Sequence, residues 1–365
     1  MSETTGTPAA DGTATARTVA VIGAGTIGLG WIALFAAAGM AVRVNSRRPD
    51  AEHHVRAALG RYAATLPGGP RDPQELAARL RFEPDLARAV EGAHVVQENT
   101  PEDLALKRDL FARAGAAAGP RALLLSSTST LSPDDLGSAM DDPSRLLVAH
   151  PFNPPHIVPL VEVVAGERTD PAAVDDTVSF YRGLGKTPVV LRRTVPGFVA
   201  NRLQSALLRE SIHLVREGVV SVAELDGIVT ASIGPRWAAV GPFRAFHLGG
   251  GPGGLRHWFR HLGVGLERGW AELGTPPVDE VTVGTVIAQA DEAFGARSYE
   301  ELAADRDTVQ NAVIEAVART RAGAPDTAGG RADDAAAGGP LEARSKPARS
   351  PLEARSSPAR EQLPS

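Results

Sequence analysis

The segment Thr18-Val-Ala-Val-Ile-Gly-Ala-Gly-Thr-Ile-Gly-Leu-Gly-Trp31 decides the fold of this chain. Its first part, residues 19–22, is short, largely β-branched and uncharged, as expected of a strand that is buried on both faces. A glycine-rich turn follows, and then an apolar, alanine-rich stretch continues to Gly39. The segment therefore predicts a strand, a tight turn and a helix in direct succession.

The glycines of this turn have the spacing Gly-x-Gly-x-x-Gly, which is found in dinucleotide-binding sites. Gly23 allows the sharp turn, Gly25 lets a pyrophosphate approach the backbone, and Gly28 lets the helix pack close to the strand. Thr26 and Ile27 lie where free amides at a helix N-terminus bind phosphate. The alternative is an ordinary glycine-rich turn, but the strand before it and the helix after it favour a dinucleotide site.

The end of the next predicted strand, residues 41–45, bears on the choice of cofactor. In NAD-binding proteins of this kind an acidic residue about 20 positions past the glycines holds the ribose 2′-hydroxyl, whereas an arginine suits a 2′-phosphate. Here Ser46 stands in place of the acid and Arg47 and Arg48 follow, each able to bind a phosphate. The alternative is two solvated surface arginines. We expect NADPH as the cofactor, with NADH as the second choice. Because NADPH usually serves reduction, we expect the enzyme to act as a ketone reductase.

Composition excludes several classes of function. The 365 residues have a formal charge of −5 and only 5% aromatic residues, so we expect no nucleic-acid partner. The chain has no cysteine, which rules out disulfides and thiolate metal sites, and we expect no metal. We find no signal-peptide pattern in residues 1–16 and no apolar run of the ~18 residues that cross a bilayer. We expect a cytoplasmic protein that does not bind membranes.

Strand and helix patterns alternate along the first half of the chain. This alternation predicts an α/β fold, a Rossmann-type doubly wound parallel sheet extended by a late hairpin-like pair. The candidate strands are residues 18–22, 41–45, 94–98, 122–126, 146–150, 159–164 and 188–191.

After Pro196-Gly197 the strand signals largely stop and helical patterns take over. Residues 198–217 predict one long helix, and capping boxes at Ser221-x-x-Glu224 and Ser298-x-x-Glu301 open two more. From residue 323 the composition collapses to Ala, Gly, Pro, Arg and Ser, which predicts disorder. We therefore expect a disordered lead-in (1–16), a dinucleotide-binding domain (17–196), an all-helical substrate and dimerisation domain (197–322) and a disordered tail (323–365).

Glu162 is the most informative polar residue outside the glycine turn. Val161 and Val163 flank it in an apolar strand, where a carboxylate is costly without a partner. His150 closes a neighbouring predicted strand, and a carboxylate beside it would orient the ring and favour its imidazolium form. The alternatives are a core histidine and a glutamate on an edge strand. Together the two residues indicate an acid–base pair.

The evidence for a family comes from short segments spread over residues 17–295: 23–31, 98–103, 126–131, 149–155, 160–162 and 196–202. In order and spacing they resemble the 3-hydroxyacyl-CoA dehydrogenase superfamily. Segments 234–237, 240–243 and 247–251 resemble its branch of short 3-hydroxyacid enzymes, with carnitine 3-dehydrogenase and L-gulonate 3-dehydrogenase, the latter close to lambda-crystallin. The stereospecific ketoreductases of aromatic polyketide tailoring are also similar to this family.

The resemblance implies catalytic roles for four residues: His150, Glu162, Ser129 and Asn201. It also places Glu102 near the nicotinamide and Lys107 behind it. In the resulting hypothesis His150 delivers a proton to the substrate oxygen, while Ser129 and Asn201 donate hydrogen bonds to the developing alkoxide. Ser46 departs from the acidic residue expected of NAD-linked members and puts the family's cofactor choice in doubt.

Residues of the helical part are candidates for substrate binding. Arg236 would pair with a substrate carboxylate, and Trp237 and His247 belong to an aromatic-rich stretch, 237–270, that suits a planar ketone or a quaternary ammonium. The alternative is ordinary helix packing.

Taken together, these observations predict a homodimeric enzyme that reduces a small-molecule or carrier-bound 3-keto acid or 3-oxoacyl group with NADPH. Our first interpretation is a ketoreductase of aromatic polyketide biosynthesis. The alternatives are an NAD-dependent dehydrogenase of a small 3-hydroxy acid, similar to carnitine or gulonate, and a non-catalytic dinucleotide-binding protein.

Overall fold

The computed structural model describes residues 17–261 and 263–322. The expected lead-in, 1–16, and the expected tail, 323–365, lie outside the described residues. Within them, strands form between residues 18 and 190, and from residue 200 onward the regular elements are helices.

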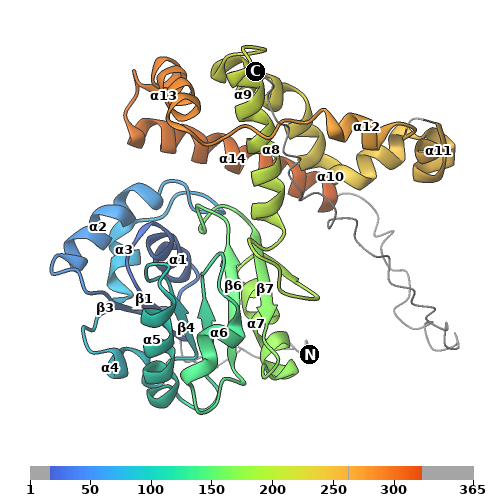
Figure 1. The fold of residues 1–365 in the computed structure, drawn as a ribbon. Helices are drawn as coiled ribbons and strands as arrows, with labels where there is room; N and C mark the ends of the chain where they lie inside the picture. Colours follow the sequence, from blue (N-terminus) through green and yellow to red (C-terminus); the bar gives the residue numbers. More distant parts are fainter. Residues whose placement is uncertain (1–16, 262, 323–365) are drawn as a thin grey trace, which may run out of the picture. The chain divides into compact units, whose positions relative to one another are not determined.

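The strands form one sheet with the order β3-β2-β1-β4-β5-β6-β7-β8 (Figure 1). Strands β1 to β6 are parallel to one another, whereas β7 is antiparallel to β6 and parallel to β8. The strands are β1 (Thr18–Ile22), β2 (Ala41–Asn45), β3 (Leu80–Phe82), β4 (Val95–Glu98), β5 (Leu123–Ser126), β6 (Leu146–Pro151), β7 (Leu160–Ala165) and β8 (Thr187–Val190).

The predicted fold class is confirmed, and each predicted strand lies within one residue of an observed one. Strand β3 was missed because its three residues are too few to show a periodic pattern. The expected hairpin-like pair is only partly correct, since β6 and β7 pair antiparallel but β8 runs parallel to β7.

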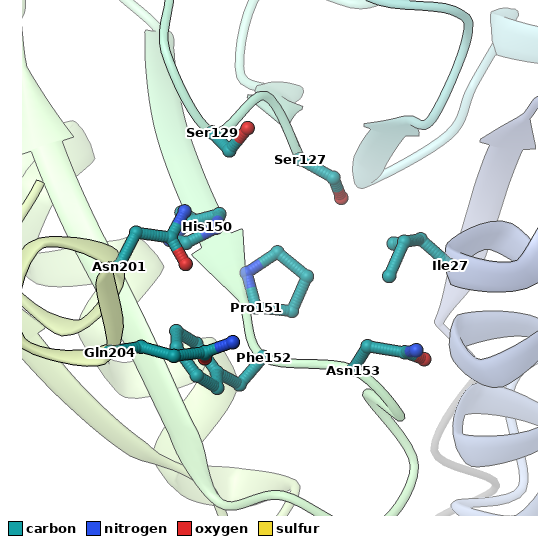
Figure 2. A pocket seen from close by; sticks show the side chains of 9 residues that line it. All are labelled: Ile27, Ser127, Ser129, His150, Pro151, Phe152, Asn153, Asn201 and Gln204. Atoms are coloured by element: carbon teal, nitrogen blue, oxygen red, sulfur yellow. The ribbon is translucent and has the colours of Figure 1, made fainter. Parts of the chain in front are cut away.

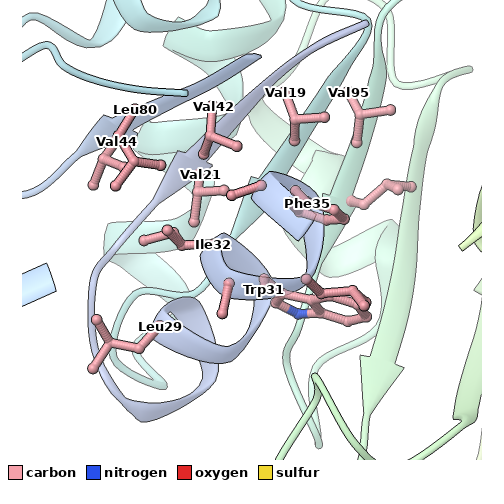
Figure 3. Packing of buried hydrophobic residues seen from close by; sticks show 14 of the residues in the cluster. Val19, Val21, Leu29, Trp31, Ile32, Phe35, Val42, Val44, Leu80 and Val95 are labelled. Atoms are coloured by element: carbon pink, nitrogen blue, oxygen red, sulfur yellow. The ribbon is translucent and has the colours of Figure 1, made fainter. Parts of the chain in front are cut away.

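Helices cover both faces of the sheet, which makes it doubly wound. Trp31 and Phe35 of α1 are fully buried in one cluster with Val21 of β1 (Figure 3). On the other face Phe111 of α5 packs with Leu124 of β5. Burying one such side chain stabilises the fold by about 1.5–3 kcal/mol. The helices are α1 (Thr26–Ala37), α2 (Ala51–Tyr62), α3 (Pro73–Ala78), α4 (Leu86–Val90), α5 (Leu104–Ala117), α6 (Pro133–Leu136) and α7 (Pro171–Gly183).

The strand order fixes where a ligand can bind. After β3 the chain returns to the other side of β1, so that Ile22 pairs with both Asn45 of β2 and Glu98 of β4. In open sheets of this kind, ligands bind in the crevice beyond the carboxyl ends of the strands where the order reverses. The glycine turn begins directly after Ile22, at that crevice.

The C-terminal part contains α8 (Ala200–Arg216), α9 (Val222–Ala231), α10 (Ile233–Gly249), α11 (Gly254–His261), α12 (Leu266–Ala271), α13 (Glu280–Phe294) and α14 (Tyr299–Ala322). Both predicted capping boxes are present, with reciprocal hydrogen bonds between Ser221 and Glu224 and between Ser298 and Glu301. Helices α9 and α10 contain no buried residue. Within the described ranges, no helix has the length and apolar character that a membrane span requires.

Candidate active site

A groove of about 1160 Å³ lies at the carboxyl ends of β1, β2 and β4. The glycine turn forms one wall, and residues after β2 and β4 form others. Gly23, Gly25, Thr26 and Ile27 are among the predicted cofactor residues that line it. Gly28 lies in the first turn of α1 and is buried.

The turn has the geometry that a bound pyrophosphate needs. Gly23 has a φ of 92°, and a Cβ there would lie 2.7 Å from the Asn99 carbonyl oxygen. A Cβ on Gly28 would lie 2.0 Å from the Gly23 carbonyl oxygen. At Gly25, in contrast, a Cβ would meet nothing within 4 Å, so the backbone is open to the groove. Helix α1 also begins without a side-chain cap, which leaves its first amides available to an anion.

Ser46, Arg47 and Arg48 all line the groove at the end of β2, but their side chains differ in what they bind. Arg48 is held by Asp50, with Nε donating to Oδ1 at 3.1 Å and Nη2 to Oδ2 at 2.9 Å. The Ser46 hydroxyl accepts a hydrogen bond from the Arg48 backbone amide. Arg47 makes no side-chain hydrogen bond or ion pair with the described residues. Arg47 is therefore the arginine that is free to bind a ligand.

His150 and Glu162 form a buried pair on adjacent strands. They are direct partners in the antiparallel register of β6 and β7, and His150 Nδ1 lies 2.9 Å from Glu162 Oε2. The two residues are 5% and 2% exposed. Because a carboxylate only accepts, Nδ1 carries the hydrogen and Nε2 is left to face a substrate.

The second oxygen of Glu162 fixes the start of α8. Oε1 accepts hydrogen bonds from the backbone amides of Val199 at 2.9 Å and Ala200 at 3.1 Å. Gly197 and Phe198 take positive φ values of 72° and 47°, which turn the chain so that these amides point at the carboxylate. For Phe198 this conformation is strained, and it places the buried ring 5.3 Å from that of the histidine on β6.

The Glu162 carboxyl remains ionised in spite of its burial. Burial raises the pKa of Glu162, but hydrogen bonds from His150 and from the backbone at the start of α8 outweigh it and hold the pKa below its usual range. A negatively charged carboxylate therefore stands behind the imidazole at neutral pH.

A second cavity, of about 400 Å³, brings three of the predicted catalytic residues together (Figure 2). Ser129, His150 and Asn201 line it, with Glu162 behind the histidine. Ile27 lines both this cavity and the groove, so the two hollows adjoin at the start of α1. The other lining residues are Ser127, Pro151, Phe152, Asn153 and Gln204.

The two serines on the cavity wall have different surroundings. The Ser127 hydroxyl donates to Asn99 Oδ1 at 2.8 Å and accepts from Trp31 Nε1 at 3.1 Å and from Gln97 Nε2 at 3.0 Å. The Ser129 hydroxyl makes no hydrogen bond within the described part of the chain. Ser129 is thus the serine whose hydroxyl is available to a substrate.

Glu102 and Lys107 line neither hollow among the residues that the structure describes. Lys107 is buried and its Nζ lies 2.7 Å from Glu98 Oε1 and 3.5 Å from Glu102 Oε2. Glu102 accepts hydrogen bonds from the Ser129 amide at 3.1 Å and from the Thr130 hydroxyl at 2.8 Å. It also accepts one from the Thr128 hydroxyl. Both residues therefore support the loop that carries Ser129, at a position behind the cavity wall.

The pKa of Glu102 follows from these contacts. Burial would raise it, but hydrogen bonds from Thr128 and Thr130 and the nearby Lys107 ammonium lower the pKa below its usual range. The carboxylate is therefore charged when it binds the loop.

The structure does not bring Arg236, Trp237 or His247 to the cavity. All three lie on α10, and none is among the described residues that line either hollow. Helix α10 is interrupted at Gly241, whose φ is 71°. His247 Nδ1 accepts a hydrogen bond from the Leu255 backbone amide instead.

Sequence reasoning missed one buried aromatic, Phe198, and five cavity residues: Ser127, Pro151, Phe152, Asn153 and Gln204. Pro151, Phe152 and Asn153 follow the histidine directly in the chain, so their position was a usable signal. Gln204 lies one helical turn after Asn201, on the same face of α8. Phe198 lies just before that helix in a strained backbone conformation, and no periodic sequence pattern marks it.

Two models of one protein family match consecutive parts of the chain. A family model described as the 3-hydroxyacyl-CoA dehydrogenase NAD binding domain matches residues 18–194, and the model of the C-terminal domain of the same family matches residues 197–275. The chain is 43% identical over 303 residues to an L-carnitine dehydrogenase of Streptomyces coelicolor, covering 83% of this chain and 95% of that protein. It is 40% identical to an L-carnitine dehydrogenase of Pseudomonas aeruginosa, covering 84% and 95%.

A solved structure gives a similar result. The structure of 5-formyl-3-hydroxy-2-methylpyridine 4-carboxylic acid 5-dehydrogenase, described as an NAD⁺ dependent dismutase, matches with a TM-score of 0.68 and 30% identity. The match covers 83% of this chain and 99% of that one.

Proposed function

The chain belongs to the 3-hydroxyacyl-CoA dehydrogenase family, and from this premise we propose that it interconverts the 3-hydroxy and 3-keto forms of a small acid related to L-carnitine. That it is an oxidoreductase follows from the family. The observation that carries the proposal is the buried His150–Glu162 pair at the wall of a cavity that adjoins the dinucleotide groove.

Each polar group of the cavity has a separate task in this reaction. The nicotinamide cofactor, when bound, accepts or supplies the hydride. In the oxidative direction His150 Nε2 takes the proton of the substrate hydroxyl, and Glu162 stabilises the imidazolium that results. Ser129 and Asn201 donate hydrogen bonds to the same oxygen. In the reductive direction His150 returns the proton.

The comparisons support a small 3-hydroxy acid better than an aromatic polyketide. Both relatives named above are L-carnitine dehydrogenases, and they align over most of their own length. The polyketide interpretation therefore becomes the second choice, and delivery of the acyl group on a carrier stays a prediction. The cytoplasmic location likewise stays a prediction.

The proposed cofactor is NADP(H), and this part rests on the end of β2 alone. The matched family model is that of an NAD binding domain, which favours NAD(H). Against this, Ser46 offers no carboxylate to a ribose 2′-hydroxyl, and Arg47 lines the groove without a partner among the described residues. An unpaired arginine at this position attracts a 2′-phosphate.

The helical part, 197–322, is proposed to form the interface of a homodimer. Phe243 and Trp270 are 76% and 61% exposed, and α9 and α10 bury nothing. Apolar surface of this extent is characteristic of an interaction site. The division at residues 196 and 197 is part of the same proposal.

The test is a dehydrogenase assay on the purified protein. L-carnitine and simple 3-hydroxy acids are offered with NAD⁺ or NADP⁺, and formation of the reduced nicotinamide is followed by absorbance. We expect turnover of at least one 3-hydroxy acid and its loss in His150→Ala. Turnover by His150→Ala at the wild-type rate would contradict the proposed mechanism.

A further inference from the structure

Lys186 lies between α7 and β8, and its ammonium is buried without a carboxylate partner. The residue is 7% exposed, and no ion pair in the described part of the chain involves it. A buried charge costs free energy unless other groups replace its hydration. The contacts that Lys186 makes in place of a carboxylate therefore indicate what it holds in position.

Two of those contacts are backbone carbonyls of the connection between β6 and β7. Nζ donates to the Val158 carbonyl at 2.9 Å and to the Pro155 carbonyl. This connection joins the strand of the catalytic histidine to the strand of its carboxylate. It also carries Phe152 and Asn153, which form one wall of the catalytic cavity.

The third contact reaches another wall of the same cavity. Lys186 Nζ lies 5.7 Å from the ring centre of Trp31, within the range of a cation–π interaction. Trp31 Nε1 in turn donates to the Ser127 hydroxyl, which lines the cavity. Figure 2 shows Ser127 on one side of Pro151 and Phe152 on the other.

We propose that Lys186 is a positioning residue that sets the width of the substrate cavity. It holds the Phe152 wall through two carbonyls and the Ser127 wall through Trp31. The proposal rests on the proposed function in that this cavity binds the substrate. The proposal adds that the affinity for substrate depends on the Lys186 ammonium, which does not contact the substrate.

The ionisation of the surrounding groups supports this assignment. Burial lowers the pKa of Lys186 to about 7. Its titratable neighbours are His156 of the β6–β7 connection, whose pKa burial lowers to about 3, and Tyr181 of α7, whose pKa burial raises. Arg306 and Asp307 of α14 pair with each other beyond His156. Lys186 is therefore the group of this set that changes charge near neutral pH.

Loss of this proton removes the cation–π attraction but leaves two N–H donors for the carbonyls. We therefore expect the interaction of Lys186 with Trp31 to weaken as the pH rises through about 7. The affinity for substrate should weaken with it.

The first experiment uses Trp31 as a probe and requires no enzyme activity. Of the four tryptophans, Trp237, Trp258 and Trp270 are replaced by phenylalanine, so that the emission of Trp31 is seen alone. We expect the emission to titrate with a midpoint near pH 7 and the transition to vanish in Lys186→Met. A flat profile in the protein that keeps Lys186, or an unchanged transition in Lys186→Met, would overturn the proposal.

The second experiment separates affinity from turnover. Lys186→Met should raise KM about tenfold while kcat stays within about threefold, because the catalytic groups remain in place. Lys186→Arg, which keeps the charge and hydrogen-bond donors, should restore most of the wild-type KM. Arg182→Met, at an exposed position of α7, serves as the control. A Lys186→Met enzyme with an unchanged KM, or a Lys186→Arg enzyme as impaired as Lys186→Met, argues against positioning. If no substrate turns over, the proposed function fails while the Trp31 titration still decides the role of Lys186.

Discussion

Glu162 stands directly opposite His150 in the antiparallel pairing of β7 with β6, and its two oxygens serve different partners. Oε2 binds the imidazole at 2.9 Å, whereas Oε1 binds the backbone amides that begin α8. That helix carries Asn201. One carboxylate therefore sets the position of the proposed proton carrier, His150, and of the helix that carries the proposed hydrogen-bond donor, Asn201.

Replacing this carboxylate by an amide should remove catalysis without unfolding the protein. In Glu162→Gln the amide NH₂ donates to His150 Nδ1, so the hydrogen moves to Nε2, which can no longer accept the substrate proton. We expect kcat for oxidation to fall about 10²–10⁴-fold. Glu167→Gln, on an exposed glutamate just past β7, is the control. Wild-type kcat in the first variant would separate Glu162 from the reaction.

The same residue predicts how stability depends on pH. The pKa of Glu162 is lower in the folded protein than in the unfolded chain, so its stabilising effect is complete above the unfolded value of ~4.3. The effect is lost as the pH falls through the folded pKa. Urea unfolding of wild type and Glu162→Gln should show a stability difference that shrinks toward acid. A stability difference between the two proteins that grows as the pH falls would contradict this prediction.

The serines at the cavity should respond differently to truncation. Ser129→Ala removes a hydroxyl that has no partner among the described residues, and we expect kcat to drop about 10²–10³-fold with little change in Tm. Ser127→Ala leaves Trp31 and Gln97 without their acceptor and should lower stability by about 1–3 kcal/mol, with a smaller effect on kcat. Steady-state kinetics and thermal unfolding of both variants decide this. The reverse pattern would assign the catalytic hydroxyl to Ser127.

Cofactor choice should depend on Ser46 and Arg47. Ser46→Asp introduces a carboxylate that can bind a ribose 2′-hydroxyl and repels a 2′-phosphate, so we expect its Kd for NADP⁺ to rise about tenfold or more. Arg47→Ala should weaken NADP⁺ but not NAD⁺, whereas Arg48→Ala should change NADP⁺ less because Asp50 already holds that guanidinium. Calorimetric titration gives both dissociation constants. Tighter binding of NAD⁺ than of NADP⁺ by the wild type would reverse the proposed preference.

The exposed aromatic residues of the helical part predict a dimer. Phe243→Glu combined with Trp270→Glu places charges on this surface, and we expect the sedimentation coefficient to shift from that of a dimer to that of a monomer. Arg88→Glu on α4 provides a control for an added negative charge elsewhere. A monomeric wild-type protein at micromolar concentration would exclude the proposed interface.

Much of the sheet was predictable because buried parallel strands have a clear signature. Uncharged β-branched runs located the strands, and the spacing of three glycines located the groove. The pairing of His150 with Glu162 was anticipated from the cost of a buried carboxylate. In each case the sequence implied a large free-energy cost, such as that of a buried carboxylate without a partner, and few structures avoid that cost.

The missed features depend on tertiary contacts that leave no local pattern. The places of Glu102 near the nicotinamide and of Lys107 behind it stay predictions, but their contacts with each other and with the Ser129 loop were not foreseen. The role of Phe198 follows from its backbone conformation, and that of Lys186 from carbonyls about thirty residues away. For the aromatic-rich stretch 237–270, the sequence does not show which direction the side chains face, so a substrate-binding wall and ordinary helix packing were both left open.

The reversal of direction at β7 makes the chemistry unusually sensitive to the length of one connection. Side chains alternate across a strand, so a slip of one residue between β6 and β7 would carry Glu162 to the opposite face of the sheet. Insertions between the two strands can persist in descendants of this chain only where the pairing is kept. Residues 46–49, which follow β2, lie outside the strand pairing, so substitutions there can change the proposed cofactor preference without shifting His150 relative to Glu162.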